Sequence, residues 1–310
     1  MTSFVFPGQG SQFIGMSRDF YDNFDTAKKT FQLVEDITKI NIKDIIFENS
    51  KNFLDITEYT QLSIFASSLS IFNVLNDEFD INNDFEINYF LGHSLGEYSA
   101  LCASKFFTIE DCSKLLKIRG NLMQNAFKPN ESGMAAILGL NKDIVEKIIN
   151  ENNLSIEIAN DNSPIQIVVS GIKKNLLYSE NFFLKNNAKK FIYLNVSAAF
   201  HSNLMINAQE QLNEYIKKIE IHDPLYSIIS NFSAEASNNK EIIVNNLSNQ
   251  MSNRVRWVES INLLENLNET KIIEIGPGRI LSGLIKRISS KFKIFNINKI
   301  EDLKVIADEF

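Results

Sequence analysis

Tyr89-Phe90-Leu91-Gly92-His93-Ser94-Leu95-Gly96-Glu97-Tyr98-Ser99-Ala100-Leu101 is the stretch that carries the strongest fold signal in this sequence. The apolar run from Ile87 to Leu91 predicts a buried strand, and Glu97 to Ser104 predicts a helix. Between them, Gly92-x-Ser94-x-Gly96 has the pattern of a nucleophile elbow, a strained turn between a strand and a helix. The hydroxyl of Ser94 would then lie at a helix N-terminus, where free N–H groups can stabilise a developing negative charge.

A lone G-x-S-x-G pattern is weak evidence, because it occurs by chance and serine is a common helix N-cap. The strand expected before Ser94 and the helix expected after it favour a catalytic serine. A serine hydroxyl also needs a base and an oxyanion donor, so the interpretation depends on finding both elsewhere in the chain.

The composition limits the possible classes of protein. The chain has 310 residues, 44% hydrophobic and 22% charged, which suits one large domain or a large domain with an insert. The net charge of -7 argues against a general nucleic-acid surface. Two cysteines, Cys102 and Cys112, indicate neither a metal cluster nor a disulfide framework, so no metal is expected. No signal peptide or membrane-spanning run is visible, and we expect a soluble cytoplasmic protein.

Two regions of the sequence differ in the order of their predicted strands and helices. Strands alternate with helices in residues 1–125 and 196–310, which predicts a large α/β domain with a doubly wound, mainly parallel sheet. Residues 126–195 instead show the order β-α-β-β-α-β, with a turn expected from Asn160 to Pro164 and the last strand from Lys190 to Val196. That order is typical of a ferredoxin-like module, so we expect an inserted ferredoxin-like α+β subdomain.

Only three histidines can act as the base for Ser94. His93 adjoins the serine, and neighbours on an extended segment point to opposite faces. His222 lies in the turn Ile221-His222-Asp223-Pro224, where it is expected to be solvated. His201 follows Ala198-Ala199-Phe200 at the expected end of a strand, where open α/β sheets place their sites. Elimination therefore favours His201, and because no Asp or Glu clearly completes a triad, we expect a dyad.

Three further residues have a functional and a structural interpretation. The turn Pro7-Gly8-Gln9-Gly10 has neither P-loop nor dinucleotide-binding spacing; it is either a tight turn or brings the amide of Gln9 to a ligand. Arg119 falls among apolar residues of a predicted helix, a setting that favours a buried anionic partner. Gln61 begins another predicted helix and either faces a site or caps that helix.

Taken together, these motifs resemble the malonyl-CoA:acyl carrier protein transacylases and the related acyltransferase domains of polyketide synthases. The resemblance runs nearly end to end and implies a hydrolase-like α/β domain with a ferredoxin-like insert. It rests on an ordered set of motifs: Phe6-Pro7-Gly8-Gln9-Gly10-Ser11-Gln12, Thr60-Gln61, the elbow from Gly92 to Leu101, Arg119-Gly120, Gly133-Met134-Ala135-Ala136, Ala199-Phe200-His201, Val255-Arg256-Trp257 and Gly276-Pro277-Gly278.

The resemblance implies a role for each matching residue. Ser94 would be the acylated nucleophile and His201 its base, with Arg119 binding the free malonyl carboxylate. The remaining implied roles belong to residues around these three: oxyanion-hole N–H groups of Gln9 and Leu95, pocket-lining side chains of Gln61, Phe200 and His93, and the main-chain carbonyl of Gln250 orienting His201.

The implied activity is transfer of malonyl from malonyl-CoA to the phosphopantetheine thiol of acyl carrier protein, in support of fatty-acid synthesis. The enzyme would act as a monomer without a cofactor. Ala198-Ala199-Phe200-His201 resembles malonyl-selective polyketide acyltransferases, so a trans-acting polyketide role stays open. Two rival functions are hydrolysis of acyl thioesters and docking of carrier proteins by an inactive scaffold. Arg119 favours transfer over hydrolysis, and intact Ser94, His201 and Gln9 argue against the scaffold.

Overall fold

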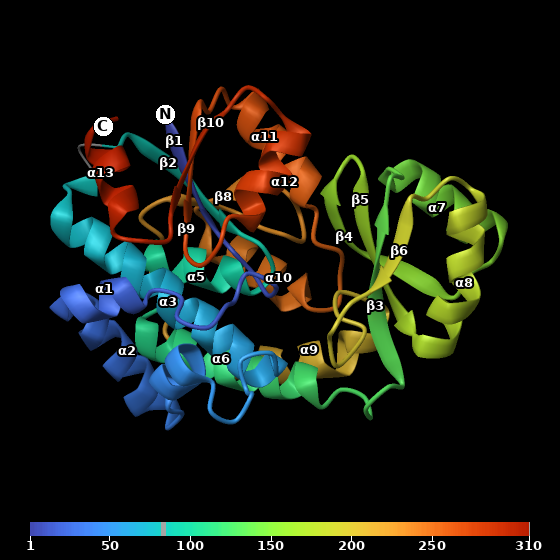
Figure 1. Cartoon of the computed structure of the whole chain (residues 1–310), viewed down its shortest axis with the longest axis horizontal. Coiled ribbons are helices and arrows are strands. Elements are labelled where there is room, and N and C mark those ends of the chain that lie inside the picture. Colours follow the sequence, from blue (N-terminus) through green and yellow to red (C-terminus); the bar gives the residue numbers. More distant parts are fainter. Residues whose placement is uncertain (82–84, 310) are drawn as a thin grey trace.

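The computed structural model describes residues 1–81 and 85–309, and its largest element is a six-stranded sheet with the order β10-β9-β1-β2-β7-β8 (Figure 1). The first five strands in this order run parallel, and β8 joins the edge antiparallel. The strands are β1 (Thr2–Phe6), β2 (Ile87–Gly92), β7 (Ser227–Ile229), β8 (Ala236–Ser237), β9 (Lys271–Ile275) and β10 (Lys293–Ile297). The predicted doubly wound, mainly parallel sheet is confirmed.

Both faces of this sheet are buried. Successive residues of β1 point to opposite sides, and each side packs against a hydrophobic core. Phe4 and Phe6 belong to a core with Phe90 on one face, and the rings of Phe4 and Phe90 stack at 5.2 Å. Val5 packs on the other face against α11 (Trp257–Asn266) and α12 (Ile280–Ile288). Each such buried aromatic or aliphatic side chain contributes roughly 1.5–3 kcal/mol of stability.

The Phe4 face is covered by most of the helices. They include the long α3, whose residues are buried along nearly its whole length, and the helix that follows the elbow. In chain order they are α1 (Arg18–Asn23), α2 (Asp25–Thr38), the π-helix η1 (Asp44–Glu48), α3 (Thr57–Glu78), α5 (Leu95–Ala103), α6 (Ile109–Gln124), α9 (Ile206–Ile216) after the 3₁₀ turn η2 (Asn203–Met205), α10 (Lys240–Gln250) and α13 (Glu301–Ala307).

A separate four-stranded sheet forms the smaller subdomain, seen at the right of Figure 1. Its order is β4-β5-β3-β6 and every pairing is antiparallel, as in a ferredoxin-like fold. Its strands and helices are β3 (Ser132–Leu138), α7 (Lys142–Glu151), β4 (Ile156–Ser163), β5 (Gln166–Ile172), α8 (Lys173–Lys185) and β6 (Lys190–Tyr193). The expected ferredoxin-like insert is confirmed, and its elements lie within the predicted segment 126–195.

One local prediction in this subdomain is wrong. The polar run Asn160–Asn162 is part of β4, and the turn to β5 is confined to Pro164 and Ile165. Asn and Asp favour turns when they are exposed. Here they are buried, and the N–H of Asp161 donates to the carbonyl of Val255 in the large domain at 3.0 Å. Tertiary pairing therefore overrides the local turn preference.

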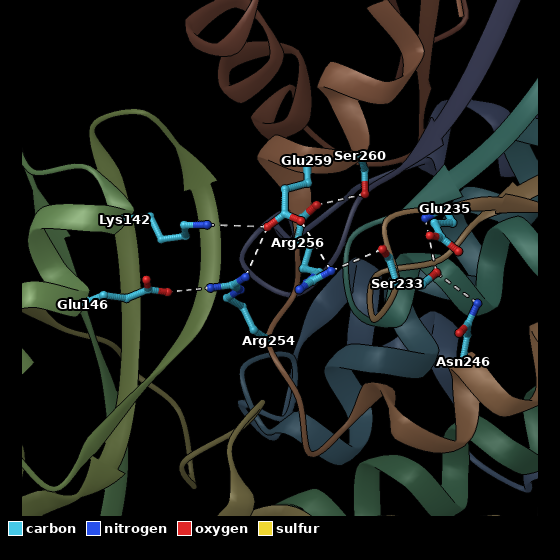
Figure 2. A network of polar contacts seen from close by, with 9 residues as sticks. All are labelled: Lys142, Glu146, Ser233, Glu235, Asn246, Arg254, Arg256, Glu259 and Ser260. Atoms are coloured by element: carbon cyan, nitrogen blue, oxygen red, sulfur yellow. Dashed lines mark hydrogen bonds and ion pairs between the residues drawn. The ribbon is translucent and has the colours of Figure 1, made fainter. Parts of the chain in front are cut away.

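Ion pairs join the smaller subdomain to the large domain beside the hydrogen bond between Asp161 and Val255 (Figure 2). Arg254 donates to Glu146 of α7 at 2.9 Å and to Glu259 of α11 at 3.2 Å. Lys142, at the start of α7, lies 3.9 Å from the same Glu259. Since these side chains are only partly exposed, the network holds the subdomain against the segment that precedes α11.

Within the described residues, no helix is both long and apolar enough to cross a membrane.

Candidate active site

The turn at Ser94 has the geometry of a nucleophile elbow. β2 ends at Gly92, α5 begins at Leu95, and Ser94 between them has φ 53° and ψ −107°. A Cβ atom on Gly92 would lie 2.0 Å from the carbonyl group of Gly96. One on Gly96 would lie 2.1 Å from the carbonyl oxygen of Phe6. Both glycines are therefore required for close packing of strand and helix, which holds the serine in its strained conformation.

Ser94 and His201, 107 residues apart in sequence, are in direct contact. Oγ of Ser94 lies 2.8 Å from Nε2 of His201. Nδ1 of the imidazole lies 3.0 Å from the carbonyl oxygen of Gln250 and 3.2 Å from that of Asn253. Because a carbonyl only accepts, Nδ1 carries the proton and Nε2 is free to accept the serine proton. This arrangement is a dyad oriented by main-chain carbonyls.

His201 does not follow the end of a strand, in contrast to the expectation from sequence. β6 ends at Tyr193, and His201 lies in an irregular segment with φ 57°. The segment is held by tertiary contacts: the N–H of His201 donates to the carbonyl of Met251 at 3.0 Å, and the hydroxyl of Ser170 donates to the carbonyl of Phe200. The expected strand end was wrong because these partners come from distant parts of the chain.

The surroundings of His201 keep it neutral. Burial, followed by the nearby positive charge of Arg119, lowers the pKa of His201 to about 3. The imidazole is therefore unprotonated at neutral pH, which is the form that a general base requires. Burial likewise lowers the pKa of His93, whose Nε2 lies 2.8 Å from Oδ1 of Asn162.

Arg119 of α6 brings a buried positive charge to Ser94. Its Nη1 donates to Oε1 of Gln61 at 2.6 Å, and its Nη2 donates to Oε1 of Gln250 at 2.9 Å and to Oγ of Ser94 at 3.1 Å. The side chain is 1% exposed. In the described part of the chain none of its hydrogen-bond partners is a carboxylate, and the buried carboxylate of Glu97 acts on it only as a nearby charge.

The N-terminal turn packs directly on the elbow. A Cβ atom on Gly8 would lie 2.3 Å from the carbonyl oxygen of His93, which places Gln9 beside Ser94. Leu95 is the first residue of α5, and the N–H groups of a first helical turn have no carbonyl partner within the helix. Both residues line the cavity at Ser94, where their N–H groups are candidates for an oxyanion hole.

The predicted residues meet at one small cavity of about 130 Å³. The cavity is lined by eight of the predicted residues: Gln9, Gln61, His93, Ser94, Leu95, Arg119, Phe200 and His201. Gln250 contacts the site from behind, through its side chain and its carbonyl. The cavity shares Met134, Leu194 and Val196 with a larger cleft of about 670 Å³. His222 is half-buried elsewhere and does not line the cavity.

Sequence reasoning missed several polar residues of the site. Asn231 holds the backbone of the elbow, Asn253 contributes a carbonyl to His201, and Asn162 contacts His93. Glu97 lies within the elbow motif, yet the motif gives no hint of the contacts that its carboxylate makes. The only signal for the asparagines was their position in short polar segments, which also suits ordinary loops.

An α/β fold with a serine elbow, a histidine in contact with that serine and a charged pocket is typical of serine acyl transferases and hydrolases. The family model for the acyl transferase domain matches residues 3–298. The malonyl CoA-acyl carrier protein transacylase of Bacillus subtilis is 37% identical over 307 residues, which cover 98% of this chain and 95% of that protein.

Solved structures agree with this assignment. The acyl-carrier-protein S-malonyltransferase of Bartonella henselae superposes with a TM-score of 0.94 at 35% identity, covering 99% of this chain and 98% of the other. A malonyl-transacylase in complex with its type II polyketide synthase acyl-carrier protein has a TM-score of 0.94 at 29% identity, with 100% and 99% of the two chains covered. This chain belongs to the acyl transferase family of malonyl-CoA:acyl carrier protein transacylases, which confirms the predicted family.

Proposed function

We propose that this protein transfers the malonyl group of malonyl-CoA to the phosphopantetheine thiol of acyl carrier protein through a malonyl-Ser94 ester. The observation that carries the proposal is the buried guanidinium of Arg119, which lies 3.1 Å from the nucleophile and donates only to neutral oxygens among the described residues. A buried charge of this kind is stabilised by a substrate that brings its own carboxylate.

The first half-reaction acylates Ser94. The hydroxyl gives its proton to Nε2 of His201 as the oxygen attacks the thioester carbonyl carbon. The N–H groups of Gln9 and Leu95 stabilise the negative oxygen of the tetrahedral intermediate. When the carbon–sulfur bond breaks, the CoA sulfur takes the proton from His201 and leaves as the free thiol.

The second half-reaction reverses these steps with a different thiol. The phosphopantetheine thiol of the carrier gives its proton to His201 and attacks the ester carbonyl. The bond to Ser94 breaks, and the serine oxygen recovers the proton. In CoA and in the carrier protein the thiol lies at the end of the same pantetheine arm. One channel can therefore serve both substrates. The larger cleft of about 670 Å³, partly lined by apolar side chains such as Leu176 and Leu177, has room for that arm.

Arg119 supports selection of malonyl over neutral acyl groups. Its planar fork suits a carboxylate, and the two nitrogens already bond to the neutral oxygens of Gln61 and Gln250. The carboxylate of bound malonyl would also offset the positive charge that lowers the pKa of His201. The correct substrate would in this way strengthen the base that acts on it.

Fatty-acid synthesis is the proposed pathway, and a trans-acting role in polyketide synthesis is the alternative. We further propose that the protein is a cytoplasmic monomer. Both cysteines are buried free thiols, as is usual for proteins of a reducing compartment. Sedimentation of the purified protein tests the oligomeric state.

The decisive experiment follows labelled malonyl from malonyl-CoA. With carrier protein bearing phosphopantetheine, label should appear on the carrier, whereas carrier without the arm should receive none. Free malonate released at the same rate with and without carrier would indicate a hydrolase. A protein that forms no labelled Ser94 ester would be an inactive scaffold.

A further inference from the structure

The peptide groups on both sides of Ser94 are held by side-chain amides. The N–H of Ser94 donates to Oδ1 of Asn231 at 2.7 Å, and its carbonyl accepts from Nε2 of Gln250, also at 2.7 Å. Asn231 in addition donates through Nδ2 to the carbonyl of Gly92 at 2.6 Å. A non-glycine residue with φ 53° is strained and persists only where its surroundings hold it.

One buried carboxylate oxygen connects the two amides. Oε2 of Glu97 accepts from Nε2 of Gln250 at 2.9 Å and from the main-chain N–H of Asn231 at 3.2 Å. Glu97 is 0% exposed and lies in the first turn of α5, three residues after the nucleophile. Both supports of Ser94 therefore depend on the same acceptor atom.

This acceptor also adds to the contacts that fix which way the amide of Gln250 points. Oε1 of Gln250 accepts from Arg119, while Nε2 donates to Ser94 and Glu97. A flipped amide would turn an NH₂ group toward the guanidinium and an oxygen toward two acceptors. With the oxygen of Glu97 in place, only one orientation satisfies all three contacts.

We propose that Glu97 is a positioning residue, which fixes the peptide groups of the nucleophile Ser94 by orienting Asn231 and Gln250 through a single hydrogen-bond acceptor. The inference rests on the proposed role of Ser94 in acyl transfer. The required property is an acceptor oxygen rather than a charge: Oε1 has no hydrogen-bond partner in the described structure, so a proton there leaves Oε2 free to accept. Burial raises the pKa of Glu97 to about 7, which agrees with a role that does not need ionisation.

The test compares Glu97→Leu, which removes the acceptor, with Glu97→Gln, which keeps a carbonyl oxygen. Glu274→Leu is the matched control, because Glu274 is an equally buried carboxylate that binds the N-terminus of α12. Single-turnover acylation by malonyl-CoA should slow about 10²-fold in Glu97→Leu, because displacing a nucleophile by about 1 Å typically costs that factor. The KM for malonyl-CoA should change little. Glu97→Gln should recover most of the rate, and Glu274→Leu should keep it.

Three results would overturn the proposal: an unchanged rate in Glu97→Leu, an equal loss in Glu97→Gln, or an equal loss in Glu274→Leu. If Glu97→Leu does not fold, Asn231→Ala removes one of the two supports, and an unchanged acylation rate in that variant would also overturn it. A wild-type protein that is never acylated would instead refute the proposed function, so the two failures can be told apart.

Discussion

Nη2 of Arg119 lies 3.1 Å from Oγ of Ser94, so a fixed positive charge and the proposed attacking oxygen line the same cavity. A ligand carboxylate bound to Arg119 must therefore lie close to the carbon that Ser94 attacks. In a malonyl thioester a single methylene separates these two groups. The short distance between charge and nucleophile matches a three-carbon diacid, and this match underlies the first prediction.

Replacing Arg119 with Ala should abolish the preference for malonyl. Loss of one partner of a buried charge pair typically costs about 3–5 kcal/mol, or roughly 10²–10³-fold or more in kcat/KM. Acetyl transfer should persist because Ser94 and His201 are untouched, and Arg119→Lys should recover little because a point charge replaces the planar fork. The measurement is the ratio of malonyl to acetyl kcat/KM in each variant. An unchanged ratio in Arg119→Ala would assign Arg119 a structural role only.

Removing the base should slow acylation far more than removing a distant histidine. Loss of general-base catalysis typically costs ~10²–10⁴-fold, so His201→Ala should lose that factor in the rate at which malonyl mass is added to the protein. His222→Ala is the matched control, since His222 does not line the cavity. Ser94→Ala should show no adduct. Comparable losses in both histidine variants would mean that His201 is not the base.

Acylation should be insensitive to pH across the range in which histidine usually titrates. The pKa of His201 is lowered to about 3, so the neutral base persists as the pH falls from 8 to 5. An ordinary imidazole with a pKa of about 6.5 would lose roughly 30-fold in its neutral fraction at pH 5. The second-order rate constant of acylation at low malonyl-CoA, which reports the pKa of the free enzyme, should stay flat over this range. A decline with a midpoint near 6.5 would show that Arg119 and burial do not depress the pKa of the base.

Glu97 should make folding stability fall as the pH rises from about 4.5 to about 7. Burial raises its pKa from 4.5 to about 7 in the folded protein, so in this window the folded state holds a proton that the unfolded state has released. Each pKa unit corresponds to ~1.4 kcal/mol, which gives about 3 kcal/mol in all. Since Glu97→Gln does not titrate there, its stability relative to wild type should increase from pH 4.5 to 7.5 in urea unfolding. A constant difference would refute the raised pKa.

Much of the fold follows from local patterns. In β1 the apolar run Phe4-Val5-Phe6 is typical of a strand, which the structure shows buried on both faces, and the β-α-β-β-α-β order predicted the insert. The polar stretch of β4 shows where such patterns fail. Asn160–Asn162 has turn-forming residues, but pairing with β5 and with Val255 keeps it extended. Likewise, β8, β10 and α13 are short edge or terminal elements that depend on neighbours rather than on a strong period of their own.

Sequence alone determined the elbow, because its requirements are steric and local. Gly92 and Gly96 leave room for the backbone that crosses them, and Ser94 between them adopts the strained turn. Only the tertiary structure decided what holds that turn and what acts on it. Asn231 and Gln250 reach Ser94 across 137 and 156 residues of sequence, and the partners of Arg119 come from α3 and α10. Side-chain hydrogen bonds between distant segments leave no periodic signal, since they form only when packing brings the helices and strands together.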